Sequence, residues 1–119
     1  MNYDASSLNG SGGMDKFHKQ LKENNITHEQ YMTVAKKAAK DNGYNPNNLE
    51  MCNDGNHKLI YEDVPFGKVG YNDYIIYTLS KNEKADKHRD AYRARATKIK
   101  GDWKDDKNSP NNLAINILW

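Results

Sequence analysis

The side chains best suited to binding chemistry are the basic ones between residues 81 and 100. This stretch contains eight Lys and Arg residues against three Asp and Glu residues, a net charge of +5, whereas the whole chain of 119 residues carries +2. Arginine binds phosphate through its planar guanidinium, so the cluster favours contact with nucleic acid, although a solvated helix face or a face that meets an acidic protein has the same composition. We expect the contact to be made by Lys87, Arg89, Arg93, Arg95, Lys98 and Lys100.

Metal-binding and catalytic groups are present, but their spacing does not favour a reactive site. The four histidines lack HxxxH spacing, and the single cysteine, Cys52, has no partner in the chain for a disulfide. Cys52 is expected to be a structural thiol that lies near His57 only because both flank a predicted turn. Asp73 and the other acidic residues are expected at the solvated surface. The sequence therefore predicts no catalytic residue, no metal site, no cofactor and no small-molecule ligand.

Two helices are predicted ahead of the basic segment. Phe17 and Leu21 lie four residues apart, which indicates a short first helix from Met14 to about Asn24. The second helix should begin after Thr27, which can form a capping box with Gln30, and should end before Gly43, which suits a left-handed conformation. Its buried stripe is predicted to be Tyr31, Val34, Ala35 and Ala38.

The helical period of the apolar residues is lost between residues 49 and 79, where we expect a small three-stranded antiparallel sheet. Turn residues at 53–56 separate the first two predicted strands, 49–52 and 57–61. The third strand is predicted at 74–79, because that run is rich in β-branched and aromatic residues. Gly67 and Gly70 lack the spacing of a phosphate-binding loop, so we interpret them as part of a tight connection.

The basic residues lie in a predicted helix, residues 83–100, that Gly101 ends. Its apolar stripe should comprise Ala85, His88, Tyr92, Ala96 and Ile99. Ser109 and Pro110 then cap and open a short last helix. The apolar residues of that helix, Leu113, Ile117 and Leu118, are expected in the domain's own core. Trp119 has the most freedom to point outward, and is predicted to anchor a partner.

The predicted fold class is therefore α+β, with two N-terminal helices, a three-stranded antiparallel sheet, a basic helix and a short C-terminal helix. We expect residues 1–13 to form a flexible N-terminal arm and residues 14–119 a single domain. No apolar run approaches the roughly 18 residues that a membrane span needs. A cytoplasm-like compartment without a membrane span is the expectation.

Four stretches of the chain resemble a family of small uncharacterised proteins from nucleocytoplasmic large DNA viruses and the smaller viruses related to or accompanying them. The stretches are residues 16–21, 64–77, 99–104 and 109–119, and the resemblance as a whole covers most of the chain after Met14. The most specific features are Trp103, the Ser-Pro-Asn-Asn turn that begins at Ser109, and the final Leu-Trp. The resemblance implies no enzymatic residues and suggests a protein of the virion, present in the host cytoplasm or viral factory during assembly.

Two functional hypotheses follow. The first is a non-enzymatic structural protein, a minor capsid or cementing component that contacts other virion or capsid proteins through its termini. The alternative is a nucleic-acid-binding protein that contacts phosphates through the basic helix, residues 84–100, with little base specificity. A small enzyme would require catalytic groups brought together from distant positions.

Overall fold

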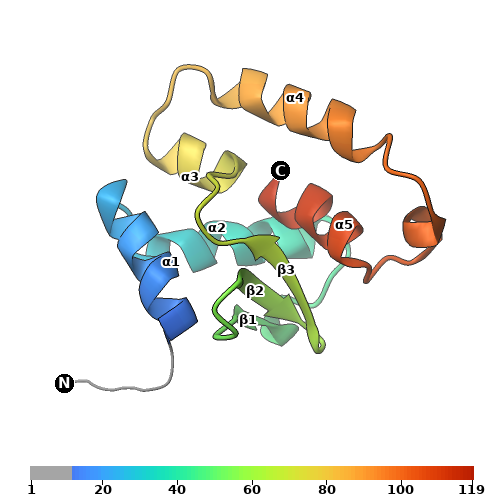
Figure 1. The fold of residues 1–119 in the computed structure, drawn as a ribbon, viewed down its shortest axis with the longest axis horizontal. Helices are drawn as coiled ribbons and strands as arrows, with labels where there is room; N and C mark the ends of the chain where they lie inside the picture. Colours follow the sequence, from blue (N-terminus) through green and yellow to red (C-terminus); the bar gives the residue numbers. More distant parts are fainter. Residues whose placement is uncertain (1–11) are drawn as a thin grey trace.

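A computed structural model describes residues 12–119, so most of the predicted arm, residues 1–11, lies outside the described residues. Gly12 and Gly13 open the first helix. The chain is α+β, as predicted, and contains a three-stranded antiparallel sheet (Figure 1). The elements are α1 (Gly12–Glu23), α2 (His28–Asp41), β1 (Leu49–Met51), β2 (His57–Tyr61), β3 (Val64–Lys68), α3 (Tyr74–Leu79), α4 (Ala85–Ala96) and α5 (Pro110–Leu113), which continues into a π-helical turn (Ala114–Leu118). None of the helices between residues 12 and 119 is long and apolar enough to cross a membrane.

Helix α2 has the ends that the sequence predicts. The hydroxyl of Thr27 accepts a hydrogen bond from the backbone N–H of Gln30, whose side chain accepts one from the backbone N–H of Thr27. Gly43 follows the helix with φ +84°, which confirms its left-handed role. The buried face is Tyr31, Ala35 and Ala39, while the predicted Val34 and Ala38 are only half-buried.

The third strand is not where the sequence predicts it. Residues 74–79 form helix α3, because the carboxylate of Asp73 caps that helix by accepting a hydrogen bond from the backbone N–H of Ile76 (2.9 Å). The true third strand, β3, pairs with β2 through a turn at Glu62 and Asp63, which have φ values of +46° and +70°. Such a turn suits the twist of a hairpin and brings the chain straight back along β2.

The C-terminal segment completes the core, as predicted. Leu113, Ile117 and Leu118 have exposed fractions of 0%, 2% and 2%. Ser109 caps α5 by accepting a hydrogen bond from the backbone N–H of Asn112, with Pro110 in the first turn. The segment packs against α2 and β3, and it lies between α2 and α4 in Figure 1.

Helix α4 lies at the outer edge of the molecule, above α3 and the C-terminal segment (Figure 1). Within it, Ala96 is the only buried residue, Tyr92 is half-buried, and His88 is exposed and stacks on Tyr77. The predicted stripe is wrong at His88 and at Ile99, which is 53% exposed. The helix ends at Ala96 and not just before Gly101 as predicted, so the helical period no longer sets the direction of the Ile99 side chain.

Candidate binding groove beneath α4

Two adjoining cavities form a groove along one side of α4. Their volumes are about 400 and 540 Å³, and both are lined by Gly67, Lys68, Tyr92 and Ala114. One wall comes from β3 and the loop that follows it, and the other from α4, the segment after it and the C-terminal segment. We call this the α4 groove; its functional side chains are Lys68, Tyr71, Tyr92, Arg95, Lys100 and Trp119.

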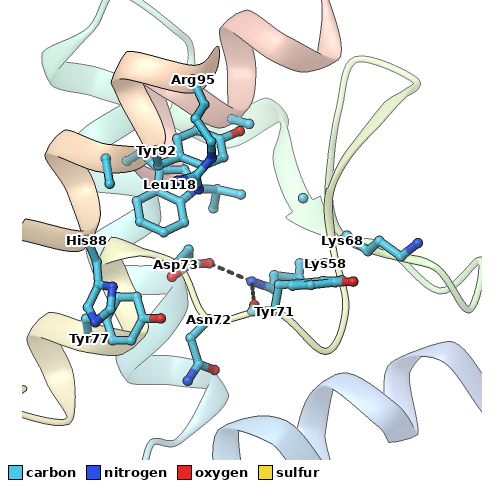
Figure 2. Close-up of a pocket in the computed structure, with 14 residues that line it drawn as sticks. Lys58, Lys68, Tyr71, Asn72, Asp73, Tyr77, His88, Tyr92, Arg95 and Leu118 are labelled. Carbon is cyan, nitrogen blue, oxygen red and sulfur yellow. Dashed lines mark hydrogen bonds and ion pairs between the residues drawn. The ribbon is translucent and has the colours of Figure 1, made fainter. Parts of the chain in front are cut away.

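A buried ion pair lies beside the groove. Lys58 and Asp73 have exposed fractions of 2% and 1%, and the ammonium of Lys58 lies 3.0 Å from Oδ2 of Asp73. Figure 2 shows this contact, with Tyr92 and Arg95 extending from α4 toward the same cavity. A charge with so little access to water is tolerated only when partners compensate it. Asp73 was expected at the solvated surface, so that expectation is wrong.

Asp73 is held from three directions. Its Oδ2 accepts hydrogen bonds from Lys58 and from the hydroxyl of Tyr31 (2.5 Å), and its Oδ1 accepts the backbone N–H of Ile76. Burial, followed by the neighbouring charge of Asp73, raises the pKa of Tyr31 well above its usual value, so the phenol stays protonated and donates. The cluster joins β2, α2 and the start of α3.

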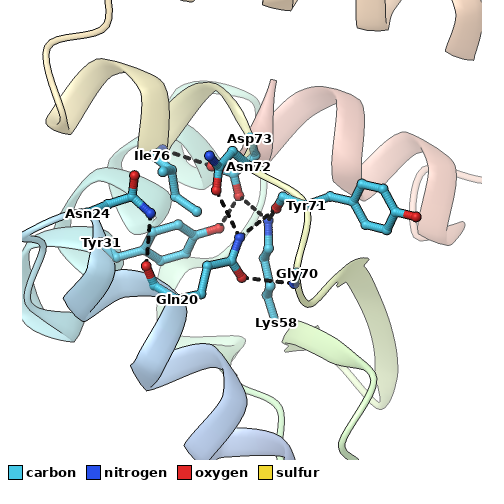
Figure 3. Close-up of polar contacts among 9 residues, drawn as sticks. All are labelled: Gln20, Asn24, Tyr31, Lys58, Gly70, Tyr71, Asn72, Asp73 and Ile76. Atoms are coloured by element: carbon cyan, nitrogen blue, oxygen red, sulfur yellow. Dashed lines mark hydrogen bonds and ion pairs between the residues drawn. The ribbon is translucent and has the colours of Figure 1, made fainter.

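The loop after β3 is held by a second buried side chain, Gln20 of α1. Its Oε1 accepts the backbone N–H of Gly70 (2.9 Å), and its Nε2 donates to the carbonyl of Tyr71 (2.9 Å) and to the side chain of Asn72 (3.0 Å). The ammonium of Lys58 also donates to the carbonyl of Tyr71. The backbone of Tyr71 is therefore fixed by two buried side chains, while its ring is 68% exposed and points away from the network (Figure 3).

The charge of the α4 groove is positive. Lys68, Arg95 and Lys100 contribute three basic side chains. Among the described residues that line the two cavities, Asp73 has the one acidic side chain, and Lys58 neutralises it. A concave surface of one charge concentrates ions of the opposite charge, so the groove suits an anionic ligand.

Aromatic rings line the same groove. Tyr92 and Trp119 stack with their ring centroids 4.2 Å apart and an interplanar angle of 8°. The backbone oxygen of Trp119 accepts hydrogen bonds from Arg93 (2.8 and 3.2 Å). The structure therefore places Trp119 against its own chain, half-buried, and its predicted contact with a partner stays a prediction.

The six predicted contact residues do not share one face. Arg95 and Lys100 line the α4 groove, whereas Lys87 and Lys98 are exposed outside it. The other two, Arg89 and Arg93, line a cavity on the opposite side of the C-terminal segment. There the guanidinium of Arg89 lies 4.9 Å from the ring centroid of Tyr74, and Arg93 binds Trp119 as described above. Lys68 and Tyr71, which the sequence did not single out, belong to the groove instead.

The other candidate groups stand apart from the groove. Cys52 is buried, and desolvation raises the pKa of its thiol. His57 does not face Cys52 as a base; its Nδ1 lies 2.6 Å from the carboxylate of Asp54. Within residues 12–119, no three His, Cys, Asp or Glu side chains come together as a metal site would require.

Comparison of the chain with models of protein families, with curated proteins and with solved structures returns no match.

Proposed function

We propose that this protein acts by binding nucleic acid, and that the strand contacts the α4 groove through its phosphates. The observation that carries the proposal is that three basic side chains and several aromatic rings line one groove, whose single acidic side chain, Asp73, is already neutralised by Lys58. Phosphate contacts supply most of the affinity of proteins that bind without sequence preference. Binding of this kind would be strongly salt-dependent and show little base specificity.

The proposed role is binding rather than catalysis. Lys58 is the most deeply buried cation near the groove, and it is already engaged by Asp73 and by the carbonyl of Tyr71. The role that fits Lys58 is to position the loop that carries Tyr71.

The test is binding of a fluorescent oligonucleotide at several salt concentrations. The variant changes Lys68, Arg95 and Lys100 together to Gln, and a matched control changes Lys19, Lys22 and Lys36 to Gln. The control residues are exposed on α1 and α2, so both triple variants lose three positive charges. The groove variant should bind more weakly, and the slope of log affinity against log salt should fall by about 2 to 3. Equal losses in the two variants would refute a site in the groove.

A structural role in a virion is the second candidate. Tyr71 and Ile99, with exposed fractions of 68% and 53%, are large apolar side chains that both line the α4 groove. Exposed aromatic and aliphatic residues are common anchors in protein interfaces. Together with the resemblance to proteins of large DNA viruses, they favour contact with capsid proteins. Extraction of purified virions at rising salt distinguishes the two roles: release with the genome supports nucleic-acid binding, and retention with the shell supports the structural role.

A further inference from the structure

We infer that the α4 groove selects single-stranded over duplex nucleic acid, and that Tyr71 provides the surface on which an unpaired base stacks. This inference rests on the proposed function and specifies its ligand. It is carried by three features of the described residues: a ring that is exposed although its backbone is fixed, basic groups that line the groove, and mixed charge on the convex face of α4.

The ring of Tyr71 is exposed, but its backbone is unusually well held. Its carbonyl accepts hydrogen bonds from both Lys58 and Gln20, and Gln20 also binds the preceding N–H of Gly70. Two buried side chains thus keep in place a loop whose aromatic ring lies mostly in water. Such preorganisation lowers the conformational entropy lost when a ligand packs on the ring. Stacking of a base on tyrosine does not depend on base identity, because every base has a π-face.

The basic groups lie where a flexible strand can reach them. Lys68 is three residues before Tyr71, and Arg95 and Lys100 come from the opposite wall of the groove. The phosphates of a duplex lie on a wide convex cylinder, and proteins read it with an element that protrudes into its grooves. A single strand has no such constraint, and it can follow a positively charged groove while its bases turn toward aromatic side chains.

The convex face of α4 is less suited to a duplex. Lys87 and Asp90, which carry opposite charges, are exposed on it, whereas Asp86 and Arg89 turn toward α3 and contact Tyr74. Arg89 is also partly engaged, with its Nε 3.5 Å from the carboxylate of Asp90. A helix that enters the major groove with this face would bring the carboxylate of Asp90 toward the phosphates, and repulsion would offset part of the attraction.

The experiment compares single-stranded and duplex DNA of about 12 nucleotides, a length within the site sizes of small single-strand-binding domains. Fluorescence anisotropy at low salt measures the affinity of the unmodified protein and of Tyr71→Ala, Tyr71→Phe and Ile99→Ala. Ile99→Ala is the matched control, because it removes the other exposed apolar side chain of the groove but no ring. Melts followed by circular dichroism confirm that each variant is folded.

We expect the single strand to bind more tightly than the duplex. Tyr71→Ala should weaken single-strand binding by about 5- to 100-fold, as the loss of one stacked base predicts, and should leave the weaker duplex binding unchanged. Tyr71→Phe should stay within about twofold, because it keeps the ring. Ile99→Ala should have a smaller effect than Tyr71→Ala on the single strand.

Two outcomes would overturn the inference: duplex binding as tight as single-strand binding, or equal losses of single-strand affinity for Tyr71→Ala and Ile99→Ala. The proposed function would stand in either case if the triple variant Lys68→Gln/Arg95→Gln/Lys100→Gln still lost affinity. If no binding depended on Lys68, Arg95 and Lys100, both the inference and the proposed function would be overturned. Competition by polyglutamate as effective as that by the oligonucleotide would show that the groove takes an acidic protein segment, which also overturns the inference.

Discussion

The ammonium of Lys58 and the carboxylate of Asp73 lie 3.0 Å apart, and both side chains are almost completely buried. Fifteen residues separate them in the sequence, and the hairpin of β2 and β3 with its following loop brings them together. The pair fixes the loop that carries Tyr71 beside the α4 groove. It is therefore the link between the packing of the core and the proposed site.

Removal of one partner of this pair should be costly. Lys58→Met leaves the carboxylate of Asp73 buried without its counter-charge, so the free energy of unfolding should fall by about 3–5 kcal/mol. The double variant Lys58→Met/Asp73→Asn should lose less than the sum of the two single losses, because neither charge then remains unpaired. Urea denaturation measures all three variants.

The control for this experiment is an exposed pair of the same type. Lys37 lies 2.8 Å from Asp41, but their side chains are 76% and 58% exposed. Lys37→Met should change the free energy of unfolding by no more than about 0.5 kcal/mol. If Lys58→Met were equally mild, the buried pair would not hold the loop.

Gly67 lies against the end of the core. Its φ is +77°, and a Cβ at this position would lie 2.6 Å from Cδ1 of Leu118. Gly67→Ala should therefore lower the free energy of unfolding by about 2–4 kcal/mol, through both backbone strain and overpacking.

Gly70 is the matched control for Gly67. It also has a positive φ, +99°, but a Cβ would meet nothing within 4 Å. Gly70→Ala should therefore show the strain alone, about 1–2 kcal/mol. Thermal melts of the two variants check this order, and a larger loss at Gly70 would contradict the packing of Gly67 against Leu118.

Acid should weaken the turn between β1 and β2 through Asp54. Slight burial would raise the pKa of this carboxyl, but hydrogen bonds from Asn56 and His57 outweigh it and lower the pKa from 3.8 to about 2. A lowered pKa means that the stabilisation is complete above the unfolded value and is lost as the pH falls from about 4 to about 2. The carboxylate is 36% exposed, so solvent screening limits the effect to less than about 1 kcal/mol.

The measurement is the pH dependence of thermal stability for the unmodified protein and for Asp54→Asn. The variant should show a flatter decline below pH 4, because it no longer takes up a proton at this position. If thermal stability fell equally with pH in the two proteins, Asp54 would contribute nothing to the loss of stability in acid.

The C-terminal segment should be indispensable for folding. Leu113, Ile117 and Leu118 are buried, and each contributes about 1.5–3 kcal/mol, so their combined loss approaches the roughly 5–15 kcal/mol stability of a small domain. Deletion of residues 113–119 should abolish the cooperative melt seen by circular dichroism. Trp119→Ala should still fold, since its indole is only half-buried, and a native-like melt of the long deletion would contradict the core assignment.

Local signals in the sequence determined both ends of α2, the start of α5 and the buried face of the C-terminal segment. Thr27 and Gln30 form the predicted capping box, Ser109 caps the last helix, and Leu113 is buried as its spacing predicts. These features involve residues within a few positions of one another, so the sequence alone contains the information that specifies them.

Tertiary structure decided the third strand and the candidate site. The run that begins at Tyr74 has the composition of a strand, but the cap from Asp73 and the tight turn at Glu62 and Asp63 assign the sheet edge to β3 instead. The groove combines Lys68 and Tyr71 with Arg95, and the loop between them depends on Gln20, about 50 residues earlier. No hydrophobic period and no short motif relates residues that lie so far apart in the sequence. The buried pair of Lys58 and Asp73 holds the loop of Tyr71 in place, and the packing of α4 against α3 brings Arg95 to the same site.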